Sequence, residues 1–241
     1  MDYSTFHAFC TFPPLLLLLV VFLSSEPRER RKRVLIAIGI TSGIALVYTT
    51  PWDNYLIWKG IWHYGRDRVV GTIGYVPLEE YLFFLIQPFI TGLWFALLRH
   101  RPRFSRTSPP RWWRMTLSSA WALVTGGGAI ALFMNGRGVY LGLILVWAGP
   151  VLVGLSWLGA EKVWAERRAF LLGVAAPTLY LWIADRLALG WGIWTISETW
   201  SLGISPLGLP VEEAVFFLVT NLLVVHGILL FLPDRSAIDE R

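Results

Sequence analysis

Two short segments of this chain each place a pair of adjacent glutamates at the start of a long apolar run. They read Pro77-Leu78-Glu79-Glu80-Tyr81-Leu82-Phe83-Phe84 and Pro210-Val211-Glu212-Glu213-Ala214-Val215-Phe216-Phe217. Two carboxyls this close in apolar surroundings cannot easily both ionise, so one member of each pair is expected to keep its proton. A protonated glutamic acid in such a site is a general acid, and its ionised neighbour is a base. The candidate catalytic residues are therefore Glu79, Glu80, Glu212 and Glu213.

A simpler interpretation is that the glutamates only favour the start of a helix. A proline at the first helical position and acids in the first turn both suit a helix N-terminus. Acidic side chains at the edge of the hydrocarbon are costly, however, unless they face a protein interior or a cavity. Because the costly feature occurs in both segments, we favour a role in chemistry.

The residues that follow each pair continue one helical face below the carboxyls. Glu80, Phe83, Phe84 and Gln87 have the spacing i, i+3, i+4 and i+7, and Glu213, Phe216, Phe217 and Thr220 repeat it, with Asn221 close by. Phenyl rings on a membrane helix often face lipid or pack, but aromatic faces also attract cations. The predicted substrate and cation pocket consists of Phe83, Phe84, Gln87, Phe216, Phe217 and Asn221.

A second pair of matching segments precedes the glutamates. Asp53 with Gly60-Ile61-Trp62 is echoed by Asp185 with Gly192-Ile193-Trp194, at an offset of 132 residues against 133 for the glutamates. Offsets this similar predict an internal duplication. Asp53, Trp62, Asp185 and Trp194 are candidate supporting residues, although the aspartates could equally be structural or solvated. Tryptophans near headgroups commonly form an interface belt.

The composition predicts the elements that position these residues. The chain has 241 residues, of which 55% are hydrophobic and 15% charged, and apolar runs near the length of a bilayer crossing recur throughout. We expect an all-α integral membrane protein without a separate soluble domain. Seven spans are predicted, at residues 5–23, 34–49, 78–98, 116–134, 139–160, 169–189 and 211–232. A wet, aromatic-rich loop is expected at residues 50–76.

The basic residues predict the orientation in the cell membrane. Of the 21 Lys and Arg residues, 16 follow the first, third, fifth and seventh spans. The positive-inside rule puts those segments in the cytoplasm. The N-terminus is then outside, the C-terminus is cytoplasmic, and the segments that carry the duplicated motifs lie on the outer side.

The odd number of spans fits the duplication. Three spans reverse the side of the chain, so a fourth is needed before a second three-span unit can have the same orientation. We therefore expect two parallel repeats, at residues 1–98 and 139–233. A basic loop and linker helix at 99–138 would join them, and 234–241 would be a cytoplasmic tail.

Several classes of function lack their usual residues. There is no Gly-x-Gly-x-x-Gly after a strand and no P-loop, so no flavin, nicotinamide or nucleotide cofactor is expected. Cys10 is the single cysteine and the four histidines are scattered, so no metal site is expected. The net charge of +5 sits in short loops, which does not indicate nucleic acid. Membrane lipid is the expected surrounding, with no evident obligate protein partner.

The double motif Pro-x-Glu-Glu-x-x-Phe-Phe, the stretch Trp52-Asp53-Asn54-Tyr55 and the Gly-Ile-Trp repeats resemble the membrane-integral lycopene cyclases. The resemblance covers essentially the full length and matches the fused form of that family. It implies closure of the linear ends of lycopene to β-rings without net redox change. A proton would add at C2, the C1 cation would be attacked by the C5=C6 double bond, and a proton would leave C6. The four glutamates would supply the acid and the base.

The residues leave several alternatives open. A related cyclase could act on C50 carotenoids, and a proton-coupled transporter would also use carboxylates within the membrane. A retinal-binding pump would need a lysine within a span, whereas Lys32, Lys59 and Lys162 fall in loops or at span edges. Neither the glutamate that donates nor the number of active pockets follows from the sequence. The copies also differ, since Tyr81, Pro88 and Asn54 correspond to Ala214, Asn221 and Arg186.

Overall fold

The computed structural model describes residues 1–99, 109–133 and 136–232, apart from the side chain of Arg111. The predicted tail at 234–241 and part of the basic loop lie outside these residues. Seven helices are long and apolar enough to cross a membrane, which confirms the predicted all-α membrane fold. They are Tyr3–Ser25, Arg28–Trp58, Leu78–Leu98, Trp112–Phe133, Val139–Ala165, Arg167–Gly190 and Val211–Phe231.

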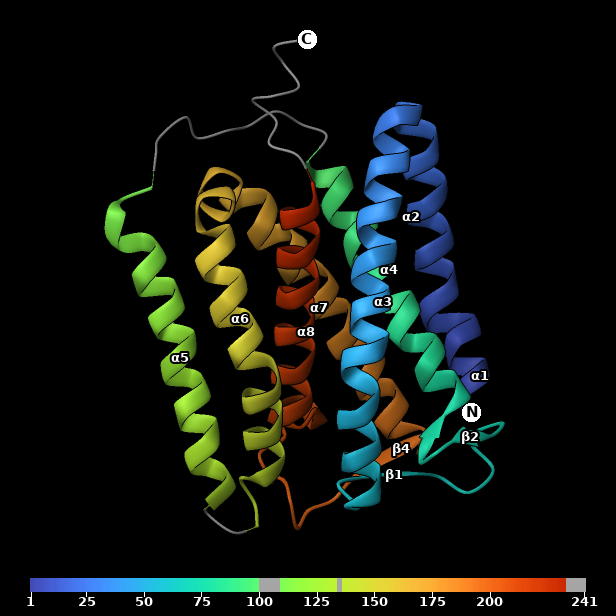
Figure 1. The fold of residues 1–241 in the computed structure, drawn as a ribbon. Helices are drawn as coiled ribbons and strands as arrows, with labels where there is room; N and C mark the ends of the chain where they lie inside the picture. The colour runs from blue at the N-terminus through green and yellow to red at the C-terminus, as the bar shows by residue number, and fades with distance from the viewer. Residues whose placement is uncertain (100–108, 134–135, 233–241) are drawn as a thin grey trace.

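Short elements complete these spans (Figure 1). The first span is divided into α1 (Tyr3–Phe6), the π-helical turn η1 (His7–Thr11) and α2 (Phe12–Ser25). The other long helices are α3 (Arg28–Trp58), α4 (Leu78–Leu98), α5 (Arg111–Phe133), α6 (Val139–Ala165), α7 (Arg167–Gly190) and α8 (Val211–Phe231). The strands are β1 (Trp62–Tyr64), β2 (Thr72–Ile73), β3 (Val76–Pro77) and β4 (Trp194–Ile196), and η2 (Pro206–Gly208) is a 3₁₀ turn.

The predicted loop at residues 50–76 is wrong in its first third, because 50–58 are the last turns of α3. Asp53 and Leu56, three residues apart on one helical face, are fully buried and continue the packed side of α3. Pro51 lies inside the helix but its side chain is exposed, so its ring does not disturb that face. Asp53 is therefore a helix residue of the core and not a solvated loop residue.

Two helices, α4 and α8, occupy the middle of the bundle and begin with the glutamate pairs. α4 packs on α2, α3 and α7, whereas α8 packs on α6, α7 and α3, and the two also contact each other. α5 packs mainly on α6 and lies at the edge of the bundle (Figure 1). The central position of α4 and α8 buries all four glutamates, at 7% exposure or less.

The two Gly-Ile-Trp segments meet at one end of the bundle. β1 pairs with β4 in antiparallel register, with Trp62 opposite Ile196, His63 opposite Thr195 and Tyr64 opposite Trp194. At an offset of 132, His63 and Thr195 are equivalent residues and the other pairs exchange with each other. A two-fold axis between the segments, along the membrane normal, would produce this register, which supports the predicted duplication.

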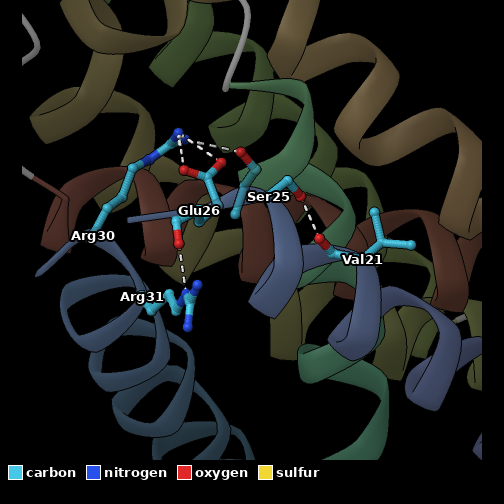
Figure 2. A network of polar contacts seen from close by, with 6 residues as sticks. Val21, Ser25, Glu26, Arg30 and Arg31 are labelled. Carbon is cyan, nitrogen blue, oxygen red and sulfur yellow. Dashed lines mark hydrogen bonds and ion pairs between the residues drawn. The ribbon is translucent and has the colours of Figure 1, made fainter. Parts of the chain in front are cut away.

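Charged residues gather at the other end of the bundle. Figure 2 shows Arg30 beside Glu26, at 2.7 Å, and Arg31 against the Glu26 carbonyl at 2.5 Å. Arg30 also donates to the carbonyl of Ala96, at 3.0 Å, which ties the start of α3 to the end of α4. Nearby, Arg99 holds Glu166 through two hydrogen bonds, at 2.5 and 2.6 Å. These contacts join α4 to the junction of α6 and α7.

Candidate active site

The second glutamate of each pair lines one shared chamber at the strand end of the bundle. Glu80 reaches it from the first turn of α4 and Glu213 from the first turn of α8. The chamber has a volume of about 440 Å³. Its other walls are mainly aromatic: Tyr3, Phe6, Trp62, Tyr64, Phe83, Trp194, Phe216 and Phe217, with Leu181, Ala184 and Asp185. Carboxyls from both predicted repeats therefore face one space.

Two tyrosines hold the Glu80 carboxyl. Tyr3 donates its hydroxyl to Oε2 at 2.6 Å, and Tyr64 donates to the same oxygen at 3.0 Å. Tyr3 comes from α1, and the pairing of β1 with β4 fixes Tyr64. Burial first, and then the nearby Glu80 carboxyl, raise the pKa of Tyr64 well above its ordinary value. This phenol therefore keeps its proton and remains a donor.

Glu213 is held by one tyrosine and not two. Tyr140, at the start of α6, donates its hydroxyl to Oε1 at 2.6 Å. The indole N–H of Trp62 in turn donates to the Tyr140 hydroxyl at 2.8 Å, which orients that phenol. Tyr3 and Tyr140 occupy corresponding places, because each lies at the start of the first long helix of its predicted repeat. The repeats thus use the same contact, with an extra donor only at Glu80.

The first glutamate of each pair binds backbone and does not line the chamber. Glu79 accepts a hydrogen bond from the Val70 N–H at 2.9 Å, and Glu212 accepts one from the Leu202 N–H at 2.6 Å. Ser4 also donates to Glu79, at 3.0 Å. These bonds attach the connections before α4 and α8 to the helix starts. The structure thus separates the members of each pair into a chamber residue and a loop anchor.

Two buried aspartates stand next to the chamber. Asp185 lines it and accepts a hydrogen bond from the Trp194 indole at 2.9 Å. Asp53 is fully buried, and neither of its carboxyl oxygens has a hydrogen-bond partner among the described residues. Both aspartates interact electrostatically with Glu80 and Glu213. No Lys, Arg or His lines the chamber in the described part of the chain, so these four carboxyls cannot all be ionised there.

The predicted pocket residues divide between two levels. Phe83, Phe216 and Phe217 line the chamber, whereas Phe84 does not. Gln87 and Asn221 lie deeper in the bundle, where the Gln87 amide donates to Asn221 Oδ1 at 2.7 Å. Among the described residues, no group of three or more His, Cys, Asp or Glu side chains is arranged to hold a metal ion.

The chamber tyrosines were not predicted from the sequence. Tyr3 and Tyr140 differ by 137 residues, against 132 or 133 for the motifs, so insertions in the first repeat unit obscure the match. A second equivalent contact follows the same offsets, since Tyr48 donates to the carbonyl of Trp147 and Tyr180 to that of Cys10. Shared tyrosines at the starts of the first and fifth spans were the available signal.

Comparison with known proteins gives strong similarities along the whole chain. A lycopene beta-cyclase of Halobacterium salinarum is 43% identical over 231 residues, which cover 95% of each chain. A bifunctional lycopene cyclase/phytoene synthase of Aspergillus niger is 37% identical over 92% of this chain and 38% of its own length. Another from Leptosphaeria maculans is 38% identical over 95% of this chain and 41% of its own length. No protein-family model matches the chain, and no solved structure matches it.

Proposed function

The chain belongs to the lycopene cyclase family, and we propose that it closes the linear ends of lycopene to β-rings. It is a multi-pass membrane enzyme of carotenoid biosynthesis that acts on a carotenoid. The single observation that supports the proposed chemistry is that Glu80 and Glu213 face the same aromatic chamber. An acid and a base on opposite walls of one apolar space are what a proton-initiated, proton-terminated cyclisation requires.

We assign the acid to Glu213 and the base to Glu80. Hydrogen bonds donated to a carboxyl oxygen favour the ionised form. Glu80 accepts two phenolic donors and Glu213 accepts one, so Glu80 is the better candidate for the carboxylate. Glu213 then adds its proton to C2 of the terminal alkene, and the C5=C6 double bond attacks the C1 cation. Glu80 removes the proton from C6, which completes an isomerisation without any redox partner.

The aromatic walls suit the cation that forms between these steps. Phe83 and Phe217 meet edge to face, with centroids 6.2 Å apart, and Phe216 lies 5.3 Å from Phe217. Ring faces attract positive charge, whereas the surrounding apolar groups exclude water that would otherwise capture it. These rings therefore stabilise the cation without offering a nucleophile.

The catalytic proton must return to Glu213 after each ring is made. Proton loss to Glu80 leaves Glu80 neutral and Glu213 ionised, the reverse of the starting state. Asp185 lines the same chamber and interacts electrostatically with both glutamates. We assign it, with the buried Asp53 beside it, as the group that carries this proton.

We further propose that the enzyme arose from two parallel three-helix repeats, at residues 1–98 and 139–233, joined through α5. The β1–β4 register and the matching tyrosine contacts of the two halves support this division. The peripheral position of α5 supports its role as the linker. In each repeat the first glutamate, Glu79 or Glu212, would serve as the loop anchor.

The proposed orientation in the cell membrane puts the chamber on the outer side and the Arg30 and Arg99 clusters in the cytoplasm. A topology reporter inserted in the basic segment 99–114 should be active in the cytoplasm. The same reporter inserted at Asp67, in the β1–β2 connection, should be active outside. The reverse pattern would contradict the orientation, although it would leave the proposed chemistry untouched.

The substrate is tested by the pigments of a lycopene-producing host that expresses the chain. We expect lycopene to be replaced by carotenoids with one or two β-rings, measured by chromatography and absorption spectra. Conversion of supplied C50 chains but not of lycopene would favour the C50 alternative. Unchanged pigments in cells that contain the inserted protein would reject the cyclase proposal and return the transporter alternative to consideration.

A further inference from the structure

A long groove leads away from the chamber along the axis of the bundle. It has a volume of about 960 Å³ and runs between α3, α4, α6 and α8. One face of α8 lines its length: Phe216, Thr220, Leu223, Val224, Gly227, Leu230 and Phe231. At 1.5 Å per residue, this face spans about 22 Å, most of the roughly 30 Å hydrocarbon core.

The groove is suited to an extended hydrocarbon and not to a compact polar ligand. Its walls contain no charged side chain. Gln87 is its single amide, and that group is already bound to Asn221. On the lipid side, Ile44 and Phe231 are about half exposed, so a chain dissolved in the bilayer can enter laterally. A linear polyene matches this length, polarity and access.

The groove and the chamber share two walls. Phe83 and Phe216 line both spaces, so the end of a chain in the groove is directed at Glu80 and Glu213. Phe216 is itself held by aromatic packing, because it stacks on Trp52 at a centroid distance of 5.7 Å and meets Trp147 at 6.1 Å. The junction is therefore preformed.

The equivalent place in the other repeat is filled. A duplicated protein could have a second groove beside α7, where Thr178 and Asn221 correspond to Leu46 and Pro88. Asn221 there accepts hydrogen bonds from Gln87 at 2.7 Å and Thr91 at 2.6 Å, and donates to Thr178 at 3.0 Å. Asn221, Thr91 and Thr178 are all at least 98% buried. This network ties α4, α7 and α8 together and leaves no matching opening at that position.

We propose that the enzyme binds one end of a carotenoid in the chamber and the rest of the chain in this single groove. The two repeats then act together on one chain end, and the second end is cyclised only after the chain leaves and enters in reverse. This inference rests on the proposed function, because it takes the chamber as the place of ring closure.

The order of products tests it. Purified protein is supplied with a large excess of lycopene, and monocyclic and bicyclic products are separated at increasing conversion. We expect monocyclic product alone at the start, with the bicyclic share rising only as the monocyclic product accumulates. A constant bicyclic share from the first turnovers would show that both ends are processed in one binding event and would overturn the inference. Absence of any cyclic product would instead count against the proposed function.

A block in the groove tests its role separately. Ala45→Phe, on the α3 wall, should reduce cyclisation roughly tenfold or more, because pocket contacts of this size have effects of that order. Ala122→Phe, on the exposed surface of α5, is the matched control and should leave turnover unchanged. If Ala45→Phe does not insert, Leu223→Trp blocks the groove from α8, with Leu123→Trp on α5 as its control. Inserted groove variants with normal rates would overturn the assignment.

Discussion

A Glu213→Gln variant is expected to cyclise lycopene about 10²–10⁴-fold more slowly than the unmodified enzyme, because it lacks the proton that starts the reaction. The substitution keeps the size of the side chain, and its amide oxygen can still accept the Tyr140 hydrogen bond. The chamber should therefore keep its shape while losing its acid. The rate is measured as product formed per amount of protein inserted in the membrane.

Glu212→Gln is the matched control for this loss. It makes the same chemical change one residue earlier, at a side chain that accepts the Leu202 N–H and does not line the chamber. The glutamine oxygen can still accept that bond, so the expected cost is on the order of 1 kcal/mol of stability, with turnover largely kept. Equal losses in both variants would contradict the separation of acid and anchor.

A Glu80→Gln variant is expected to lose the terminating step, and with it control over the type of ring. After ring closure the positive charge lies at C5, and a proton can leave C6, C4 or the attached methyl group. Without the Glu80 carboxylate, loss from C6 should slow by about 10²-fold or more. The remaining product should contain a larger share of rings with the double bond at C4 or outside the ring. Chromatography with nuclear magnetic resonance of the ring protons distinguishes these isomers.

Glu79→Gln serves as the control for Glu80→Gln, since Glu79 anchors the Val70 backbone. It should give β-rings only, at a rate close to that of the unmodified enzyme. Production of β-rings alone at an undiminished rate by Glu80→Gln would refute the assignment of the base. If Glu80→Gln is instead inactive and Glu213→Gln yields mixed rings, the two roles are exchanged.

The main elements of this fold could be predicted because their physical signals are local. Apolar runs of the length of the bilayer identified all seven spans, and the beginning of α4 at Leu78 and of α8 at Val211 followed from Pro77 and Pro210. The end of α3 could not be predicted in this way. Pro51 and the tryptophans around it are typical of a loop, whereas burial of Asp53 and Leu56 by tertiary packing extends the helix.

The candidate site was predicted in its composition but not in its arrangement. Sequence alone gave equal weight to both members of each glutamate pair, because neighbouring residues on a helix start share one local environment. Their separation depends on partners far along the chain, such as Tyr3, which lies 77 residues before Glu80. The single chamber likewise depends on how α4 and α8 pack, and no periodicity in one helix reports that contact.

Side-by-side rates for the four single Glu→Gln variants in membranes of a lycopene-producing host test the central claim most directly. Protein level must be measured in the same membranes. The account predicts that Glu80→Gln and Glu213→Gln each form β-rings at least about 10²-fold more slowly, while Glu79→Gln and Glu212→Gln stay close to the unmodified enzyme. Near-normal β-ring formation by either Glu80→Gln or Glu213→Gln, in normally inserted protein, would contradict it.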